Sequence, residues 1–414
     1  MSAASPVIGP RWIGPRPGAS IWLLFMCLAA LLCSTGCVST GGTRSPGRTT
    51  VQPKAATLQA RILSNFFLVE AKQADGHTYR FLIDTGSRAT LVSSALAKSL
   101  RLKEKSAAPS MVRLSGAMAD ELELESATLK SLQLGEATFE QVSVLIYDFT
   151  EFSGQLGLPL DGVIGFPIFR DTLLTLDYPG AKLTLLPPAT EAVRPVSTPG
   201  TSVISFNNDD NSPLIPVQMG NESFIVLLDS GSDGCLSLNP AGLHPRFVNG
   251  PRAGVVVSSL GGDHQQRVGR LAQHVMVGSI TLEQPVTDLT DQLSSLGGEF
   301  MKNFVVTFDQ RNQRVTFRHG DNSAVRMESR RNTGLSFSRS PVYWRVLAVV
   351  PDTPAALTPV ESGDLCVRIN GEPVEKWGAE RYATLLHTAT KITYTFLNGP
   401  KETDYEVPVI DLVP

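Results

Sequence analysis

Cysteine is scarce in this sequence: there are five, and three of them, Cys27, Cys33 and Cys37, fall within the first 37 residues. The other two, Cys235 and Cys366, lie in different predicted domains. No disulfide framework is therefore expected, and each of these two should be a small buried apolar residue. Histidine is also scarce, with six residues and no Cys/His pair at ligand spacing, so no zinc or other metal site is predicted.

An excess of positive charge is missing as well. The chain has 36 basic and 39 acidic residues, a net charge of −3. Without residues 1–36, which hold Arg11, Arg16 and no acids, the net charge is −3 − 2 = −5. Neither nucleic acid nor an acidic membrane surface is an expected partner of such a chain. The short basic stretch 326–331, which includes Glu328, is interpreted as a solvated linker.

Long apolar runs are rare, and the one near the N-terminus spans residues 21–32. It follows two arginines and leads through the small residues 34–36 into Cys37. The run is shorter than the roughly 20 residues that span a bilayer, so residues 1–36 are predicted to be a signal peptide. The segment resembles a bacterial lipoprotein signal, although Ser34 stands where Leu is usual. The resemblance implies a lipid attached to Cys37 and a place in the bacterial cell envelope, exported and facing the periplasm or the outside; ordinary cleavage or a retained anchor remain alternatives.

Glycine and proline, in contrast, are plentiful at 35 and 28 residues, and charged residues make up only 18% of the chain. This composition favours a folded, mostly β protein rich in turns, and 414 residues suffice for two or three domains. Polar and Pro/Gly-rich breaks separate the parts. The predicted boundaries are a flexible tether at 37–56, a first lobe at 57–187, a second lobe at 201–318 and a third unit at 330–414.

The two lobes are predicted to be copies of one plan, because four segments recur in the same order. An apolar run leads into Asp84-Thr85-Gly86-Ser87, and a similar run leads into Asp229-Ser230-Gly231-Ser232, 145 residues later. One such motif alone would indicate only a turn. Two in register indicate a site. The other matching pairs are residues 114–116 with 260–262, 135–141 with 278–284, and 165–177 with 297–309.

Two carboxylates held close together suit peptide hydrolysis. Like charges a few ångströms apart do not both ionise readily, so the pair keeps one proton and can act as base and acid. Gly86 and Gly231 allow tight turns, and the hydroxyls of Thr85 and Ser230 are expected to bond across the lobe interface. A Ser-His-Asp site is not indicated, since no Gly-X-Ser-X-Gly elbow precedes a predicted helix.

With these motifs, residues 57–318 resemble the retropepsin-like aspartic proteases in the form with two lobes in one chain. The resemblance implies two β-barrel lobes forming a pseudo-dimer within a monomer, with Asp84 and Asp229 catalytic and no cofactor. The residues that follow each acid, Thr85-Gly86-Ser87 and Ser230-Gly231-Ser232, would support the site. The family's second signature matches Val163-Ile164-Gly165 well, whereas the second lobe has Ser295-Leu296-Gly297, with Ser where an apolar residue is usual.

Members of this family cover the cleft with a glycine-tipped hairpin. Leu114-Ser115-Gly116 and Leu260-Gly261-Gly262 occupy the corresponding stretches and are flap candidates. An ordinary hairpin turn is the alternative for each.

The third unit resembles a PDZ domain, a β fold with short helices. Gly334-Leu335-Ser336-Phe337 is similar to the Gly-Leu-Gly-Phe carboxylate-binding loop, and residues 362–371 match a strand and turn of PDZ domains in envelope proteases. The resemblance implies that a polypeptide C-terminus binds at residues 334–337. The alternative is a domain that only packs against the lobes.

The sequence thus predicts an aspartic endopeptidase that acts on polypeptides and uses its PDZ-like unit to recruit or position them. A catalytically silent, peptide-binding envelope protein on the same fold is the alternative. Arg88 and Asp233, which follow the two motifs where small residues are expected, and Ser295 favour that alternative.

Overall fold

A computed structural model describes residues 45–52, 55–102, 110–113, 121–188, 198–207, 211–259, 262–320, 325–327 and 329–414. All of them lie in one compact unit, Ser45–Pro414. The fold is mostly β, as the sequence predicts. No helix in the described residues has the length and apolar character needed to cross a membrane.

In the first lobe, the strand that carries Asp84 lies in the middle of a sheet. Strand β4 (Thr78–Asp84) pairs in parallel with β9 (Gly162–Gly165), β9 is antiparallel to β5 (Thr90–Ser93), and β5 is parallel to β8 (Ala137–Tyr147). The remaining elements are β1 (Arg48–Val51), β2 (Ala56–Leu63), β3 (Phe66–Lys72), α2 (Ser94–Ser99), β6 (Ser110–Arg113), β7 (Glu121–Leu134), α3 (Thr150–Leu156), η1 (Phe166–Phe169), β10 (Leu173–Asp177) and β11 (Lys182–Leu186).

The second lobe repeats this plan. Strand β14 (Glu222–Leu228) is parallel to β21 (Ser295–Leu296), β21 is antiparallel to β15 (Leu236–Leu238), and β15 is parallel to β20 (Val286–Leu289). The other elements are β12 (Thr201–Ser205), β13 (Leu214–Met219), β16 (Phe247–Ser259), β17 (Gly262–Leu271), β18 (Val275–Val277), β19 (Ile280–Glu283), α4 (Gly298–Met301), β22 (Val305–Asp309) and β23 (Arg314–Arg318).

The repeat extends to unusual backbone conformations. Gly135 and Gly278 have φ angles of 59° and 60°, and Gln141 and Gln284, six residues after each glycine, also have positive φ angles of 55° and 44°. Positive φ is uncommon for residues other than glycine. Because both copies show it at matching places, the two lobes share the plan in detail.

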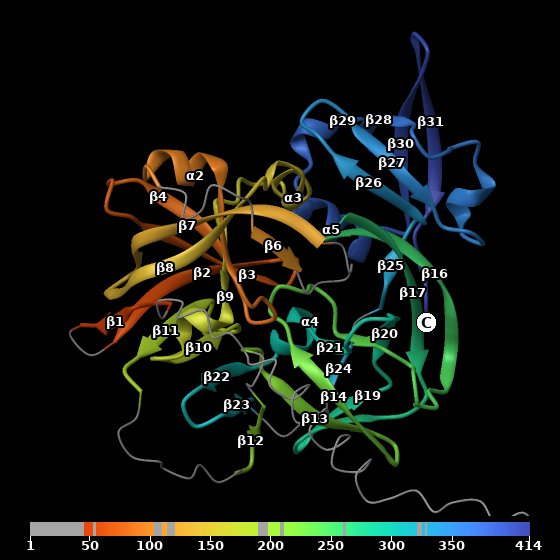
Figure 1. Ribbon diagram of the computed structural model, residues 1–414. Coiled ribbons are helices and arrows are strands. Elements are labelled where there is room, and N and C mark those ends of the chain that lie inside the picture. The colour runs from red at the N-terminus through yellow and green to blue at the C-terminus, as the bar shows by residue number, and fades with distance from the viewer. Residues whose placement is uncertain are drawn as a thin grey trace, which may run out of the picture. The chain divides into compact units, whose positions relative to one another are not determined.

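The lobes are joined through the hairpin that ends each copy. Strands β10 and β11 of the first lobe and β22 and β23 of the second form one sheet, in which β10 pairs with β22 in antiparallel fashion (Figure 1). Thr175 pairs with Thr307, 132 residues later, and their hydroxyl oxygens lie 2.9 Å apart. Equivalent residues of the two copies therefore meet at the centre of the shared sheet, as a pseudo-two-fold axis requires.

Two stretches interpreted as flexible are partly ordered. Within the predicted tether, β1 pairs with β8, which suits its β-branched residues Thr49, Thr50 and Val51. Within the break between the second lobe and the third unit, β24 (Val325–Arg326) pairs with β19, and Val325 is buried. Two apolar residues, Val325 and Met327, thus pack on the core within a segment whose polar residues indicated a solvated linker.

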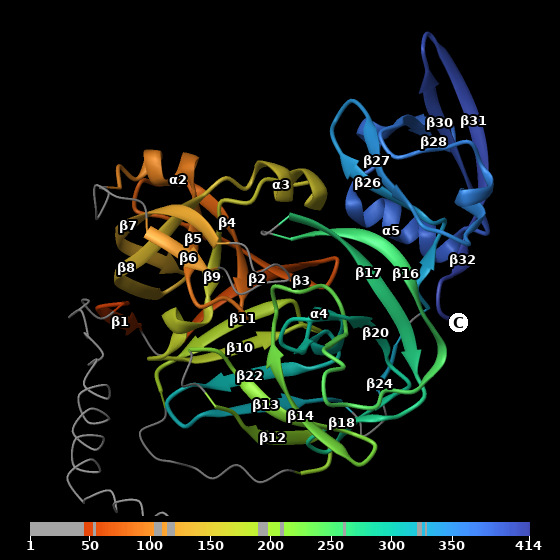
Figure 2. The same ribbon diagram turned by 45° about the vertical axis from the view of Figure 1, so that its right-hand side comes forward.

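The third unit has a sheet in the order β26-β27-β28-β30-β31 (Figure 2). It also has a hydrophobic core of its own. This core contains Trp344, Tyr382 and Tyr394, whereas a single larger core runs through both lobes. The elements are β25 (Arg331–Asn332), β26 (Leu335–Arg339), β27 (Trp344–Val349), η2 (Pro354–Leu357), β28 (Leu365–Ile369), β29 (Glu372–Pro373), η3 (Val374–Lys376), α5 (Ala379–Thr388), β30 (Lys391–Asn398), β31 (Lys401–Pro408) and β32 (Ile410–Asp411). Cys235 and Cys366 are free and buried, as predicted.

Candidate active site

The two Asp motifs follow equivalent strands and meet at the lobe interface. Asp84 ends β4 opposite Gly165 of β9, and Asp229 directly follows β14, its amide donating to Leu296 O at 2.9 Å. Each acid thus lies where a strand ends and a tight turn begins. In both turns the glycine amide hydrogen-bonds to the carboxyl of the acid: Gly86 N donates to Asp84 Oδ1 at 2.9 Å, and Gly231 N donates to Asp229 Oδ1 at 2.9 Å.

The glycine of each turn lies against the carboxyl of the opposite lobe. A Cβ on Gly86 would lie 2.4 Å from Asp229 Oδ1, and a Cβ on Gly231 would lie 2.4 Å from Asp84 Cγ. No side chain fits at either position. The two carboxyls are consequently able to approach until they hydrogen-bond to each other.

The hydroxyls of Thr85 and Ser230 bind the two turns together. Ser230 Oγ accepts from Thr85 N at 3.0 Å and donates to Ile83 O at 2.7 Å. In mirror fashion, Thr85 Oγ1 accepts from Ser230 N at 3.0 Å and donates to Leu228 O at 2.7 Å. Both side chains are fully buried, so these four hydrogen bonds, predicted in outline from the sequence, are shielded from water and fix the relative position of the acids.

The environment makes the pair retain a proton. Burial and then the charge of Asp229 raise the pKa of Asp84 well above its ordinary value. Burial also raises the pKa of Asp229, against the hydrogen bonds from Asp84, Gly231 and Ser232, which lower it. The two acids titrate as a unit, and one shared proton leaves one carboxylate and one carboxylic acid facing each other.

Tyr178 is a member of this environment that the sequence did not indicate. It follows β10, packs edge-on against Phe67 with ring centroids 5.0 Å apart, and is 3% exposed. Burial, reinforced by the charges of Asp229 and Asp84, raises the pKa of its phenol. Within the described part of the chain its hydroxyl has no hydrogen-bond partner.

The strands beside the two turns differ between the lobes. In the first lobe, Val163 and Ile164 are fully buried behind Asp84. In the second, Ser295 is 9% exposed in β21, paired with Leu227 and Ser237. The side chain of Ser295 is therefore buried. Its backbone pairs with β14 as that of Val163, its apolar counterpart in the first lobe, pairs with β4.

The flap candidates are only partly described. Leu114, Ser115, Gly116, Leu260 and Gly261 lie outside the described residues, and so does Cys37. Gly262 begins β17, where it pairs with Ser259 across the β16–β17 hairpin.

Residues 334–337 lie at the start of β26. Gly334 has a φ of 92° and donates its amide to Asn332 Oδ1 at 2.7 Å, while Leu335 and Ser336 are buried. Ser336 Oγ accepts from Val256 N of the second lobe at 2.8 Å. The hydroxyl that distinguishes this loop from Gly-Leu-Gly-Phe thus contacts strand β16.

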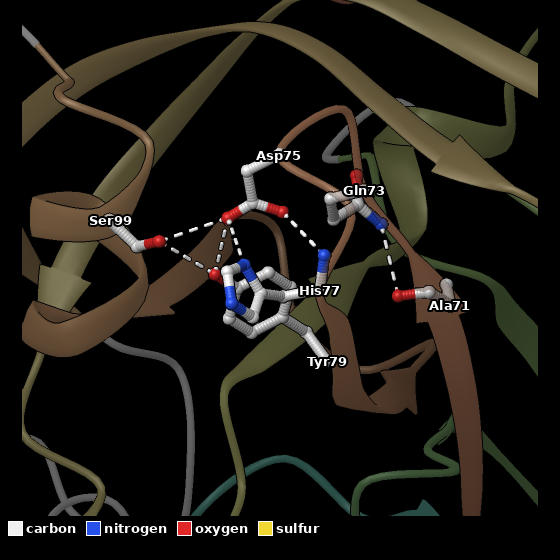
Figure 3. Close-up of polar contacts among 6 residues, drawn as sticks. All are labelled: Ala71, Gln73, Asp75, His77, Tyr79 and Ser99. Atoms are coloured by element: carbon white, nitrogen blue, oxygen red, sulfur yellow. Dashed lines mark hydrogen bonds and ion pairs between the residues drawn. The ribbon is translucent and has the colours of Figure 1, made fainter.

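A second polar cluster lies at the opposite end of β4 from Asp84 (Figure 3). Asp75 accepts from Tyr79 Oη at 2.6 Å, Ser99 Oγ at 2.9 Å and His77 N at 3.0 Å. The hydrogen bond from Tyr79 is the main cause that lowers the pKa of Asp75 to about 2. This cluster closes the turn between β3 and β4.

Across the described residues, no group of three or more His, Cys, Asp or Glu side chains is arranged to hold a metal ion. No curated protein matches the sequence. A family model described as aspartyl protease matches residues 69–168, a stretch that includes Asp84 and the strand β9 beside it. In this stretch the chain is similar to the aspartyl proteases, which supports an aspartic protease-like function.

Proposed function

We propose that this protein is an aspartic endopeptidase in which Asp84 and Asp229 together activate water. The observation that carries the proposal is the meeting of the two half-buried carboxyls, made possible by Gly86 and Gly231. A structural turn needs no second carboxyl, and placing two like charges together is unfavourable unless a proton is shared. The arrangement suits chemistry that uses one acid and one base.

In the proposed reaction, the ionised member of the pair takes a proton from a water held between the carboxyls. That water attacks the carbonyl carbon of the peptide bond, and the protonated member stabilises the forming oxyanion. A proton then passes to the leaving amine, the C–N bond breaks, and the pair again holds one proton. No atom other than those of the peptide and water is consumed.

We further propose that the third unit is a PDZ-like module that recruits or positions polypeptide, and that the protein is held at the bacterial envelope by a lipid on Cys37. The resemblance of residues 334–337 to a carboxylate-binding loop supports the first proposal. The signal-like residues 1–36 support the second. Both go beyond the family match, which covers residues 69–168 of the first lobe.

A catalytically silent peptide-binding protein is the second candidate. The buried Ser295 and the charged Arg88, whose Nε donates to Ser212 Oγ at 3.3 Å, favour it. The two carboxyls that face each other favour the enzyme, because a binding protein gains nothing from placing two acids together, whereas the cross-lobe hydroxyl bonds suit either candidate.

Digestion of a proteome-derived peptide library by the full chain, read by mass spectrometry, tests the proposal. Asp84→Asn should lower the rate by about 10³-fold or more, since the remaining carboxylate has no acid partner. Asp75→Asn is the matched control, because it removes a carboxyl in the turn that precedes the same strand, away from the site. Equal cleavage by wild type and Asp84→Asn would reject the mechanism, and a wild type without any cleavage would favour the silent binding protein.

A further inference from the structure

The turn that carries Asp229 is held from behind by three consecutive backbone amides. Gly298 N donates to Ser232 O at 2.7 Å, Gly297 N to Cys235 O at 3.0 Å, and Glu299 N to Gly234 O at 3.1 Å. These bonds run from the start of α4 to the part of the turn that follows the acid. The position of Asp229 therefore depends on where residues 297–299 lie.

The first lobe supports its turn differently. Phe166 N donates to Ser87 O at 2.9 Å, as Gly298 does to Ser232. The next residue, however, is Pro167, which has no amide hydrogen. The carbonyl of Ala89, equivalent to Gly234, accepts from the side chain of Ser87 at 2.8 Å instead. The second turn is thus the one that relies on residue 299.

Glu299 is an unusual residue for this position, because its carboxylate is buried. Its side chain is 8% exposed and accepts from Arg330 Nη2 at 2.9 Å, and Arg330 itself is 33% exposed. A buried carboxylate that loses its cation is strongly unfavourable. Without Arg330, we expect the start of α4 to shift so that water reaches the Glu299 carboxylate. Arg330 therefore keeps the Glu299 side chain in place, and with it the hydrogen bond from the Glu299 amide to Gly234 O.

Arg330 is in turn fixed by the last strand of the third unit. Its amide donates to Asp411 Oδ1 at 3.1 Å, and its carbonyl accepts from Leu412 N at 2.9 Å. Val413 is buried among Val268 and Val286 of the second lobe. Arg330, in the stretch interpreted as a solvated linker, thus contacts both the third unit, through Asp411, and α4 behind the Asp229 turn, through Glu299.

We propose that Arg330 is a positioning residue for Asp229, an inference that rests on the proposed function. Through Glu299, it holds the second catalytic turn against the first, and so supplies a support that the first lobe builds from its own Ser87. The site consequently depends on the correct seating of the segment that joins the second lobe to the third unit.

Arg330→Met in the full chain tests this role. We expect kcat to fall by about 10- to 100-fold with KM within about threefold of wild type, because the acids are misplaced while the substrate contacts stay. Arg330→Lys should recover most of kcat, since Arg330 Nε makes no bond within the described residues and one charged contact suffices. Arg314→Met is the matched control: it breaks the ion pair with Asp309, 3.0 Å long, in the sheet between the lobes, and should leave the kcat of the folded protein unchanged.

The double variant Glu299→Gln/Arg330→Met tests whether Arg330 acts through the charge of Glu299. Because Glu299→Gln removes the charge that Arg330→Met leaves unpaired, the double variant should regain most of the stability and most of the kcat that Arg330→Met loses. A double variant whose kcat stays as low as that of Arg330→Met would overturn the proposal, because Arg330 would then not hold the turn through Glu299. An unchanged kcat in Arg330→Met would overturn it as well.

Hydrogen exchange provides a readout that does not need activity. In Arg330→Met, amides of residues 297–299 should exchange faster, while those of residues 163–166 in the first lobe should not change. If wild type cleaves no peptide, the proposed function fails, and exchange still decides whether Arg330 holds the turn. Unchanged exchange at residues 297–299 would reject the positioning role.

Discussion

Gly231 occupies a position where even one methyl group does not fit. An added Cβ would lie 2.4 Å from the carboxyl carbon of Asp84, and that carboxyl is held in place by the amides of Gly86 and Ser87, each 2.9 Å from its Oδ1. We expect Gly231→Ala to separate the carboxyls and to reduce hydrolysis by at least about 10²-fold. Peptide cleavage and a thermal melt measure the change in rate and in stability.

Gly378→Ala is the control for that substitution. Gly378 has a φ of −80° and nothing within 4 Å of an added Cβ, so alanine fits there. Activity of Gly231→Ala equal to that of Gly378→Ala would contradict the geometry of the site.

Tyr178 carries a buried hydroxyl that has no hydrogen-bond partner among the residues that the structure describes. Its counterpart in the second lobe, Gln310, lies 132 residues later and donates to Phe166 O at 2.7 Å. Because a buried hydroxyl without a partner is unfavourable, Tyr178→Phe should raise the free energy of unfolding by about 1 kcal/mol, with the ring packing on Phe67 retained. Gln310→Leu should lower it. Urea unfolding measures both, and a destabilised Tyr178→Phe would show that the hydroxyl has a partner.

The hydroxyls of Ser230 and Thr85 connect the ends of strands β4 and β14, because each hydroxyl hydrogen-bonds to two backbone groups of the other lobe. Ser230→Ala removes the partners of Thr85 N and Ile83 O, both buried. We expect a loss of roughly 1–3 kcal/mol of unfolding free energy, together with a lower kcat. Urea unfolding and peptide cleavage check the two effects.

The inter-lobe sheet offers a control for that variant. Replacing Thr175 and Thr307 together by Val removes both members of a hydroxyl pair and leaves no buried group unpaired, so it should be nearly neutral. If this double variant and Ser230→Ala lower the free energy of unfolding equally, the cross-lobe bonds contribute no more to stability than an ordinary hydroxyl pair.

The sequence predicted the elements whose pattern is local. The matching segments 165–177 and 297–309 contain β10 and β22, whose repeated apolar pattern is visible in the sequence alone. The Asp turns followed from their repetition. Both features can be identified from the hydrophobic pattern and the repeated Asp motif alone.

What the sequence did not indicate depends on contacts between distant residues. Nothing in the basic stretch 326–331 distinguishes Arg330, which pairs with Glu299, from the other arginines around it. The burial of Tyr178 near both acids likewise arises from packing of the two lobes, which no local pattern encodes. Such residues are found only when the fold brings their partners together.

Over the molecule as a whole, the free energy of unfolding depends on pH in two opposite ways. An acid with a lowered pKa makes it rise with pH, and an acid with a raised pKa makes it fall. The pKa of Asp75 is lowered to about 2, so its contribution is present above its ordinary value of 3.8 and is lost as the pH falls through 2. Burial raises the pKa of Asp288 to about 6, so its contribution is present below 3.8 and is lost as the pH rises through 6. The raised pKa of Asp84 acts in the same direction as that of Asp288.

Difference curves isolate these contributions from the rest of the chain. The free energy of unfolding of wild type minus that of Asp288→Asn should decrease between about pH 4 and 6 and be flat below, because the folded protein binds the proton more tightly than the unfolded chain. The corresponding curve for Asp75→Asn should decrease as the pH falls from about 4 to 2 and be flat above. Urea unfolding at a series of pH values provides both curves. A flat curve for Asp288→Asn would mean that its carboxyl is solvated, and a curve of the opposite sign for Asp75→Asn would mean that the hydrogen bonds from Tyr79 and Ser99 do not favour the ionised form.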